Sequence, residues 1–198
     1  HNPVGRVWTR EELIRLGDIC VQHNVIVISD EIHSDFVYDG FKHHVFAALK
    51  PEFLERAITC TAPSKTFNLA GLQTSNIFIA NPHLRQRFQT EMTKSGYSQL
   101  NTMGLVACQA AYTYGAPWLD SLIQYLTQNI QFTKNFLANR LPKIRMVEPQ
   151  GTYLLWLDCR ALNLTETERN HLIAQKAKLW LSTGTTFGQS GTGFERMN

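Results

Sequence analysis

The sequence lacks the roughly 20-residue apolar run that a membrane-spanning helix needs. It also lacks a block of basic residues with interleaved aromatic side chains, and its net charge of +3 is spread along the chain. The first absence argues against a membrane protein, and the second argues against a nucleic-acid-binding surface. Repeats and low-complexity segments are missing as well, so we expect a globular protein with an ordinary hydrophobic core.

Cysteine pairs and metal-binding spacings are also missing. The chain has four widely separated cysteines among apolar neighbours: Cys20, Cys60, Cys108 and Cys159. None belongs to a Cys-x-x-Cys motif, so buried, reduced thiols in a cytoplasmic protein are expected. The adjacent His43 and His44 fall in a polar loop, where surface exposure is expected. The sequence therefore predicts no metal site.

Strand-like and helix-like patterns alternate through the first part of the chain. Thr9 and Glu12 form a capping box that begins a helix, and Asn81-Pro82 begins another. The second of these helices is expected to bury one apolar face, formed by Leu84, Phe88 and Met92. Three short apolar runs are typical of strands: residues 25–28, 57–60 and 75–80. This order predicts an α/β fold with a mainly parallel sheet covered on both faces.

The pattern changes after the break at 115–117. Apolar residues then recur every three or four positions as far as Leu137, which predicts one long helix linking two domains. The following residues predict an α+β region, with strands near 144–147, 152–157 and 178–182 and a helix capped by Thr165. We therefore expect a first domain over residues 1–116 and a second over residues 117–198.

A lysine and an aspartate follow two of the predicted strands. Asp30 comes just after the strand at 25–28, and Lys65 comes just after the strand at 57–60. Open α/β sheets bind ligands at the carboxyl ends of their strands, so both side chains are expected near a ligand. An amine that condenses with an aldehyde and a carboxylate that holds a pyridinium nitrogen are what a pyridoxal phosphate site requires. A surface lysine and a turn-forming aspartate are the alternatives.

Four segments resemble the fold-type I pyridoxal phosphate enzymes of the class I and II aminotransferase superfamily. They are His1-Asn2-Pro3-Val4-Gly5-Arg6, Asp30-Glu31-Ile32-His33, Ser64-Lys65-Thr66-Phe67-Asn68 and Gly193-Phe194-Glu195-Arg196-Met197-Asn198. The resemblance implies the C-terminal part of a mainly parallel α/β large domain, followed by an incomplete α+β small domain. It also implies that the chain is a fragment of a protein about twice as long, lacking the N-terminal half and the C-terminal end.

The resemblance also implies roles for individual residues. Lys65 would bind the cofactor aldehyde covalently and move the proton at the substrate Cα, while Asp30 would keep the pyridine nitrogen protonated. Asn2 would donate to the phenolic oxygen of the cofactor, with a plain Asn-Pro turn as its alternative. Arg196 would bind the substrate α-carboxylate through a two-pronged guanidinium pair. Glu31 is expected to be structural.

Some positions depart from the pattern of the broader family. His33 stands where that family has a tyrosine, Gln73 where it commonly has a phosphate-clamping arginine, and Ala62 where many relatives have a serine. Loss of the guanidinium weakens the phosphate clamp on this part of the chain. Arg6 and Ser64 are candidate partial substitutes, and His33 is a candidate cofactor contact.

Three longer segments, residues 2–9, 30–35 and 62–73, resemble the MalY/PatB-type cystathionine β-lyases, which are C–S lyases. This resemblance implies α,β-elimination from a small amino-acid substrate, an S-substituted L-cysteine such as cystathionine, to give thiol, pyruvate and ammonia. It also implies a homodimer at full length. A class I/II aminotransferase stays open, because both reactions begin by removing the Cα proton. A non-catalytic binding or structural module with the same fold is the alternative from another class.

Overall fold

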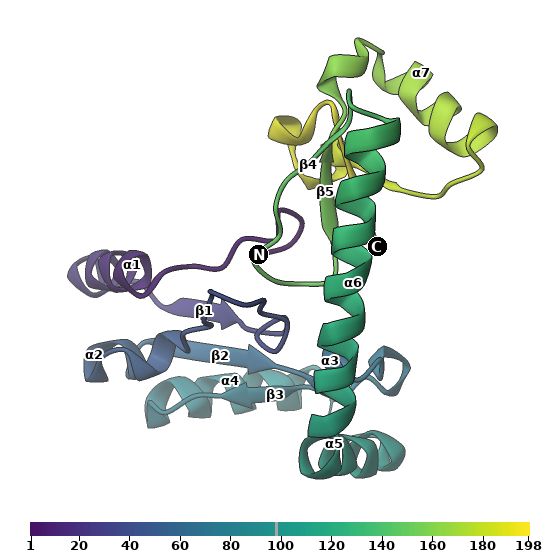
Figure 1. The fold of residues 1–198 in the computed structure, drawn as a ribbon. Helices are drawn as coiled ribbons and strands as arrows, with labels where there is room; N and C mark the ends of the chain where they lie inside the picture. Colours follow the sequence, from purple (N-terminus) through teal and green to yellow (C-terminus); the bar gives the residue numbers. More distant parts are fainter. Residues whose placement is uncertain (98) are drawn as a thin grey trace. The chain divides into compact units, whose positions relative to one another are not determined.

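The computed structural model describes residues 1–97 and 99–198 (Figure 1). Their contacts divide them into two compact units. Unit 1 comprises His1–Val7, Phe36–Phe41 and Leu122–Asn198, and unit 2 comprises Trp8–Asp35 and Lys42–Ser121. The domain boundary predicted near residues 115–117 stays a prediction, since these units are defined within this chain alone.

Unit 2 contains a three-stranded sheet in the order β1-β2-β3. β1 (Val27–Asp30) and β2 (Ala57–Thr61) are parallel, and their arrowheads point the same way in Figure 1. β3 (Asn76–Phe78) is antiparallel to β2. The chain reaches β3 through short helical turns, whereas a parallel crossover usually contains a full α-helix. All three predicted strands are therefore present, with one parallel and one antiparallel pairing.

The first helix of unit 2 begins where its capping box predicts. In α1 (Arg10–Gln22), the Glu12 backbone N–H donates to Thr9 Oγ1 at 3.3 Å, and the Thr9 N–H donates to Glu12 Oε2 at 2.9 Å. The helix packs closely on α2 (Pro51–Leu54), since a Cβ added to Gly17 would lie 2.3 Å from the Phe53 ring. Phe53 stacks on Phe46 with ring centroids 5.1 Å apart, and both are buried in the core of this unit.

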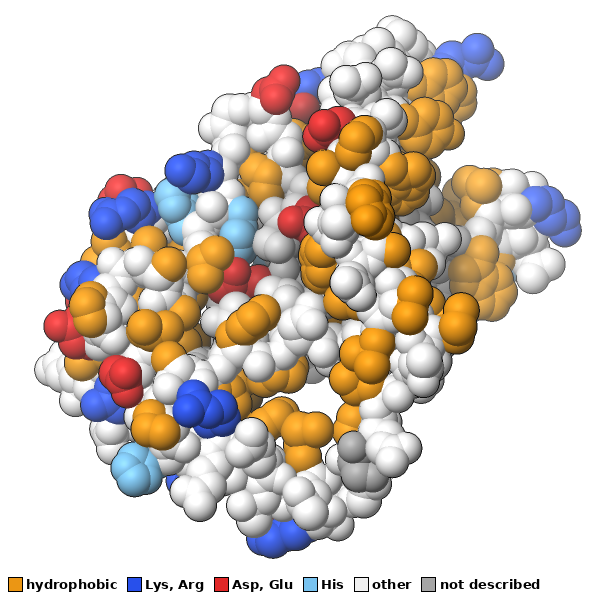
Figure 2. All heavy atoms as spheres, turned by 90° about the horizontal axis from the view of Figure 1, so that it is seen from below, with side chains coloured by type: hydrophobic (Ala, Val, Ile, Leu, Met, Phe, Trp, Pro, Cys, Tyr) orange, Lys and Arg blue, Asp and Glu red, His pale blue; other side chains and the backbone are white. Residues whose placement is uncertain are grey.

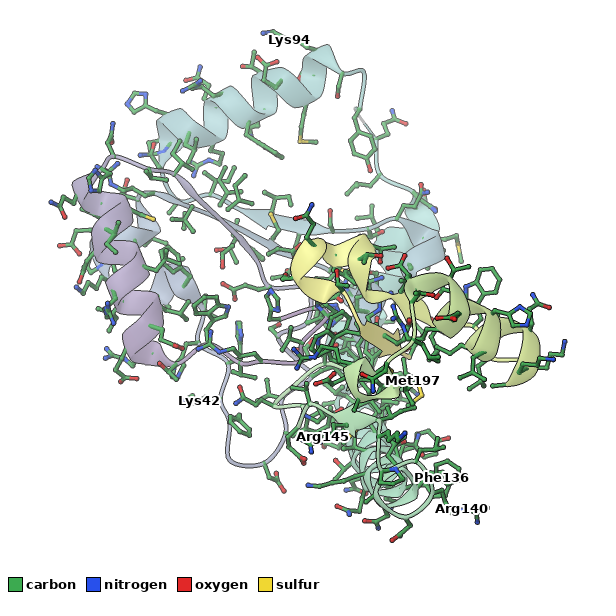
Figure 3. All side chains as sticks on the ribbon, turned by 90° about the horizontal axis from the view of Figure 1, so that it is seen from above. Lys42, Lys94, Phe136, Arg140, Arg145 and Met197 are labelled. Carbon is green, nitrogen blue, oxygen red and sulfur yellow. The ribbon has the colours of Figure 1, made fainter. Side chains whose placement is uncertain are left out.

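Two further helices of unit 2 follow β3. Asn81 caps α4 (Pro82–Lys94) by accepting hydrogen bonds from two backbone N–H groups at 3.0 and 3.1 Å, as predicted. Leu84, Phe88 and Met92 are only half-buried, and α4 has no fully buried residue among those described. The prediction that these three side chains form a buried face is therefore wrong for this chain. Figure 3 labels Lys94 at the end of α4; α5 (Thr102–Tyr114) is the next helix.

The predicted long helix is α6 (Ala116–Arg140), which has 25 residues. Its first residues belong to unit 2 and the rest to unit 1. In unit 1, its buried Leu137 packs against Leu155, Leu157 and Cys159, with Met197 at the edge of the same cluster. Figure 3 labels Phe136 and Arg140 on this helix and Met197 on the last strand.

Unit 1 contains a four-stranded antiparallel sheet in the order β4-β5-β7-β6. Its strands are β4 (Arg145–Met146), β5 (Leu155–Asp158), β6 (Ser182–Thr183) and β7 (Phe194–Met197). The helix α7 (Glu166–His171) starts with the predicted capping box of Thr165 and Glu168. The predicted α+β region is thus present, although its strands are shorter than their apolar runs.

Two segments distant in sequence complete unit 1. The Gly5 carbonyl accepts from the N–H groups of Gln150 and Gly151, at 2.8 and 3.0 Å. The Phe36 carbonyl accepts from the Thr152 N–H at 2.8 Å. A Cβ on Gly151 would lie 2.4 Å from the Phe36 oxygen, so this close backbone approach requires glycine. These contacts attach residues 1–7 and 36–41 to the carboxyl-terminal part of the chain.

The four cysteines are free thiols, as predicted. Cys159 is buried, and burial raises its pKa to about 11. Cys20, Cys60 and Cys108 are half-buried, which is less than the sequence suggested. Across residues 1–97 and 99–198, no helix combines the length and the apolarity that crossing a membrane would require.

Candidate active site

The structure places Lys65 and Asp30 at the same edge of the sheet of unit 2. Asp30 is the last residue of β1 and pairs with Cys60 of β2. β2 ends one residue later, and the short helix α3 (Pro63–Thr66) then carries Lys65. Both side chains are exposed. A carboxylate at the end of β1 and an amine just beyond the end of β2 therefore lie at the carboxyl ends of two adjacent parallel strands, where α/β proteins bind ligands.

Asp30 also shapes the turn that follows it. Its Oδ1 accepts the backbone N–H of Ile32 at 3.2 Å, so the turn-forming role weighed from the sequence is present. The Glu31 N–H donates to the Cys60 carbonyl at 2.8 Å, which extends the contact between the strands by one residue. His33 lies in this turn and is half-buried. The structure does not assign a cofactor role to the side chain of Asp30 or to that of His33.

Glu31 holds the turn from the inside, which supports its expected structural role. It is 6% exposed and accepts hydrogen bonds from Ser29 Oγ (2.9 Å) and the Phe46 N–H (3.2 Å), and its Oε2 lies 2.7 Å from His43 Nε2. Burial alone would raise the pKa of this carboxyl group, but the hydrogen bonds and the nearby imidazole lower it overall. His43 and His44 are half-buried, so they are less exposed than the sequence suggested.

The helix that carries Lys65 is tied to the same turn by a contact that the sequence analysis missed. Thr66 is fully buried, at 0% exposure, and its Oγ1 donates to Asp35 Oδ2 at 2.7 Å. Ser64 is half-buried, and its carbonyl accepts the Leu69 N–H at 3.0 Å. No short-range pattern links Thr66 to a residue 31 positions earlier.

The two family departures on this segment are also placed. Ala62 is buried, at 7% exposure, directly before α3. Gln73 is exposed and has left-handed backbone geometry with φ of 52°. Neither side chain supplies a cation, so any phosphate contact from Ser64 would have to rely on hydrogen bonding alone.

A cavity with a volume of ≈ 420 Å³ lies beside this edge. Residues from both strand ends and from α5 line it: Glu31, Ser34, Asp35, Thr61, Ala62, Asn76, Phe78 and Tyr112. Burial raises the pKa of the Tyr112 hydroxyl, with a further contribution from the negative charge of Asp35. The cavity shows that the ends of β1 and β2 border open space within unit 2.

In unit 1, Arg196 and Asn2 are in direct contact. Arg196 Nη1 donates to Asn2 Oδ1 at 3.0 Å, and Nη2 donates to Ser182 Oγ at 3.2 Å. The guanidinium carbon lies 4.7 Å above the centre of the Phe187 ring, which is cation–π geometry. Each terminal nitrogen of a guanidinium carries two N–H groups, so each keeps one further N–H group besides these bonds.

The neighbouring residue on β7, Glu195, belongs to a buried ion pair. Glu195 is 1% exposed, and its Oε1 accepts from Nε of Arg169, itself 3% exposed, at 2.7 Å. Because side chains alternate along a strand, Glu195 and Arg196 point to opposite faces of the sheet. The sequence analysis missed this pair, since nothing local connects Arg169 of α7 with β7.

Comparison with known proteins identifies a family and several similar proteins. The profile of the family described as aminotransferase class I and II matches residues 1–198. Over all of its residues, the chain is 45% identical to the cystathionine beta-lyase PatB of Bacillus subtilis and 35% identical to the protein MalY of Escherichia coli. It covers 51% and 50% of these relatives, so it spans about half of their length.

Solved structures agree with this placement. The whole chain superimposes on 51% of a PLP-bound putative aminotransferase from Clostridium difficile, with a TM-score of 0.98 and 44% identity. It also superimposes on 50% of cystalysin from Treponema denticola, which contains pyridoxal 5′-phosphate, with a TM-score of 0.97 and 39% identity. The predicted fold, part of a fold-type I α/β architecture, is thereby confirmed. The chain belongs to the class I and II aminotransferase family.

Proposed function

We propose that the complete protein containing this chain is a pyridoxal 5′-phosphate-dependent carbon–sulfur lyase. Its reaction is α,β-elimination from cystathionine or a related S-substituted L-cysteine, giving a thiol, pyruvate and ammonia. The observation that carries the proposal is the position of Asp30 at the end of β1 and of Lys65 just beyond the end of its parallel neighbour β2. An amine and a carboxylate at one sheet edge match the two functional groups that the cofactor requires.

The similarities favour elimination over transamination. The chain is 45% identical to a cystathionine beta-lyase of Bacillus subtilis, but 28% identical to an aromatic-amino-acid aminotransferase of Thermococcus litoralis. A PLP-bound C–S lyase from Staphylococcus hominis shares the fold, with a TM-score of 0.90 and 35% identity. These values support a lyase as the activity to test first.

In this proposal, Lys65 has two tasks. Its amine attaches the cofactor, and the same amine afterwards takes the proton from the substrate Cα. The Lys65 side chain is exposed just beyond the end of a strand, so it is accessible for this role. The bound cofactor supplies an electron sink for the negative charge that develops at Cα. Asp30 holds a proton on the pyridine nitrogen, with Oδ1 already oriented by the Ile32 N–H.

Arg196 and Asn2 take the roles of orienting groups. Arg196 binds the substrate α-carboxylate through its terminal nitrogens, and Ser182 and Phe187 hold its guanidinium in position. The Asn2 Oδ1 accepts from Arg196, so its amide N–H groups are directed to other acceptors, which suits donation to the phenolic oxygen of the cofactor. His33 and Ser64 are proposed as additional cofactor contacts, at the turn after β1 and on α3.

The surroundings of the enzyme belong to the same proposal. The family resemblance supports a homodimer for the complete protein, which its mass in solution would test. The four free cysteines support a cytoplasmic location. Residues 1–198 by themselves are expected to bind the cofactor poorly and to turn over little, because the matched relatives are about twice as long.

One experiment separates the candidate functions. The complete protein, loaded with pyridoxal phosphate, is incubated with cystathionine, and free thiol and pyruvate are measured together. Equal amounts of both products support the lyase. Transfer of the amino group to a keto acid without thiol would replace it by an aminotransferase. An absorption band near 420 nm that borohydride fails to remove, or no band at all, would favour a non-catalytic module instead.

A further inference from the structure

The hydrogen bond between Asp35 and Thr66 joins the two segments that carry the proposed catalytic pair. Asp35 closes the turn that begins at Asp30, and Thr66 directly follows Lys65. Asp35 Oδ2 and Thr66 Oγ1 are 2.7 Å apart. The bond therefore links the turn that follows Asp30 to the short helix that carries Lys65.

The Asp35 end of this bond is held by the turn. Asp30 Oδ1 accepts the Ile32 N–H, and the Ser34 N–H donates to the Glu31 carbonyl at 3.0 Å. Glu31 is itself anchored by its contacts with Ser29, His43 and Phe46. The backbone that carries Asp35 is thus held in place by the hydrogen bonds of the residues just before it.

The Thr66 end, in contrast, belongs to a helix of four residues. One helical turn has little stability of its own, because nucleation fixes several residues for a single hydrogen bond. A fully buried hydroxyl needs a partner, and the branched Thr side chain has few rotamers with which to find another. The bond to Asp35 therefore restrains the last residue of α3, next to Lys65.

We propose that Asp35 is a positioning residue that acts through Thr66. By fixing α3, it sets the amine of Lys65 relative to the carboxylate of Asp30. This inference rests on the proposed function, because a positioning role for Asp35 requires that Lys65 is the attachment point of the cofactor. It concerns alignment, so its loss should reduce cofactor binding and kcat more than KM.

The test uses four variants of the complete, cofactor-loaded protein. Asp35→Ala removes the acceptor from an exposed side chain, and Asp35→Asn restores an acceptor oxygen without charge. Thr66→Val removes the donor at nearly constant volume, and Thr66→Ser restores the hydroxyl. Asp18→Ala is the matched control, because it breaks an exposed ion pair with Lys50 (2.6 Å) elsewhere in unit 2.

Two readouts are needed besides activity. The first is the dissociation constant of pyridoxal phosphate, from titration of the apoprotein, and the second is the midpoint of thermal unfolding. For Asp35→Ala and Thr66→Val we expect weaker cofactor binding and a kcat about 10- to 100-fold lower, as for a misplacement of about 1 Å, with KM changed far less. Asn and Ser should recover most of both losses, and Asp18→Ala should match the wild type.

The outcomes separate this inference from the proposed function. If the wild type neither binds pyridoxal phosphate nor releases thiol, the proposed function fails. If the wild type is an active lyase and Asp35→Ala matches it in kcat and cofactor affinity, the positioning role is wrong. Should Thr66→Val fail to fold, Asp35→Ala and Asp35→Asn decide the question. If kcat falls and KM rises by similar factors, in step with a lower unfolding midpoint, the bond between Asp35 and Thr66 has only a structural role.

Discussion

The two units hold their proposed functional residues in different ways. In unit 1, Arg196 lies half-buried on β7, and Asn2, Ser182 and Phe187 all contact its guanidinium. In unit 2, Lys65 is exposed on a single helical turn. Unit 1 thus orients its cation with contacts from its own segments, whereas unit 2 relies on the backbone path at a sheet edge and on the tie to α3.

The strands behind these residues differ in the same direction. Leu155, Trp156 and Leu157 of β5 are all buried in unit 1. In unit 2, Ile28 of β1 is 70% exposed and Phe78 of β3 is 60% exposed. Figure 2, which views the molecule from below, shows many apolar side chains at the surface. Large exposed apolar areas usually mark contact surfaces, so the sheet of unit 2 is the less self-sufficient of the two.

Lys65→Ala tests the unit 2 side of the comparison most severely. The substitution removes both the attachment point and the proton acceptor at Cα, so we expect kcat to fall by about 10³-fold or more. Thiol release from cystathionine measures the loss. Lys94→Ala, on an exposed lysine of α4, is the control and should leave kcat unchanged. Retained activity in Lys65→Ala would remove the basis of the proposed function.

Glu195→Ala tests how much the buried ion pair of unit 1 contributes to the stability of the fold. It removes the 2.7 Å contact of the buried Arg169 and leaves it with the Glu166 carboxylate 4.0 Å away, so we expect the free energy of unfolding to fall by about 3–5 kcal/mol. Chemical denaturation of the complete protein measures it. The double variant Arg169→Met with Glu195→Leu should recover much of the loss, because it removes both charges. A single variant as stable as the wild type would contradict the buried ion pair.

Arg196→Lys keeps the charge in unit 1 but removes the fork. A lysine cannot make two parallel bonds to a carboxylate or keep both contacts to Asn2 and Ser182, so we expect KM to rise by about 10- to 100-fold. Steady-state kinetics with cystathionine measure the change. Arg145→Lys on β4, labelled in Figure 3, is the matched control on the same sheet. An unchanged KM would show that the guanidinium does not bind substrate.

The pH dependence of stability tests the contribution of Glu31, the buried carboxylate of unit 2. The folded-state pKa of Glu31 is lower than its ordinary value, so this carboxylate stabilises the fold above the unfolded-state pKa. The stabilisation is lost as the pH falls through the lower, folded-state value. We expect Glu31→Gln to be less stable at neutral pH and to show a weaker acid dependence of the unfolding midpoint. Parallel pH curves for the variant and the wild type would contradict this.

The two capping boxes give the smallest and most closely matched comparison. Thr9→Ala in unit 2 and Thr165→Ala in unit 1 each remove one bond to a helix N-terminus, so each should cost about 1 kcal/mol. Thermal unfolding of the complete protein measures both, and the Ser variants serve as controls. A cost confined to one unit would show that only that unit limits the stability of the whole.

Local signals account for most elements that the sequence analysis placed. The capping boxes, the Asn81-Pro82 start and the break before α6 act within a few residues, so their meaning survives in any fold. Burial was harder to infer. The apolar face of α4 is only half-buried, because burial depends on what covers a helix and not on its own periodicity.

The long-range contacts of the candidate site could not be found in this way. The bond between Asn2 and Arg196 joins residues 194 positions apart, and the bond between Asp35 and Thr66 spans 31 positions. Neither pair has a spacing that local chemistry would recognise. The contact between His43 and Glu31 likewise joins residues 12 positions apart that no local pattern connects.

The sequence by itself determined which residues can carry the chemistry, where helices begin, and that a lysine and an aspartate each follow a strand. The tertiary structure alone decided that those strands are parallel neighbours, that β3 turns back antiparallel, and that Asn2 contacts Arg196. The physical reason is that capping and periodicity are local free energies. Pairing, register and burial depend on the path of the whole backbone.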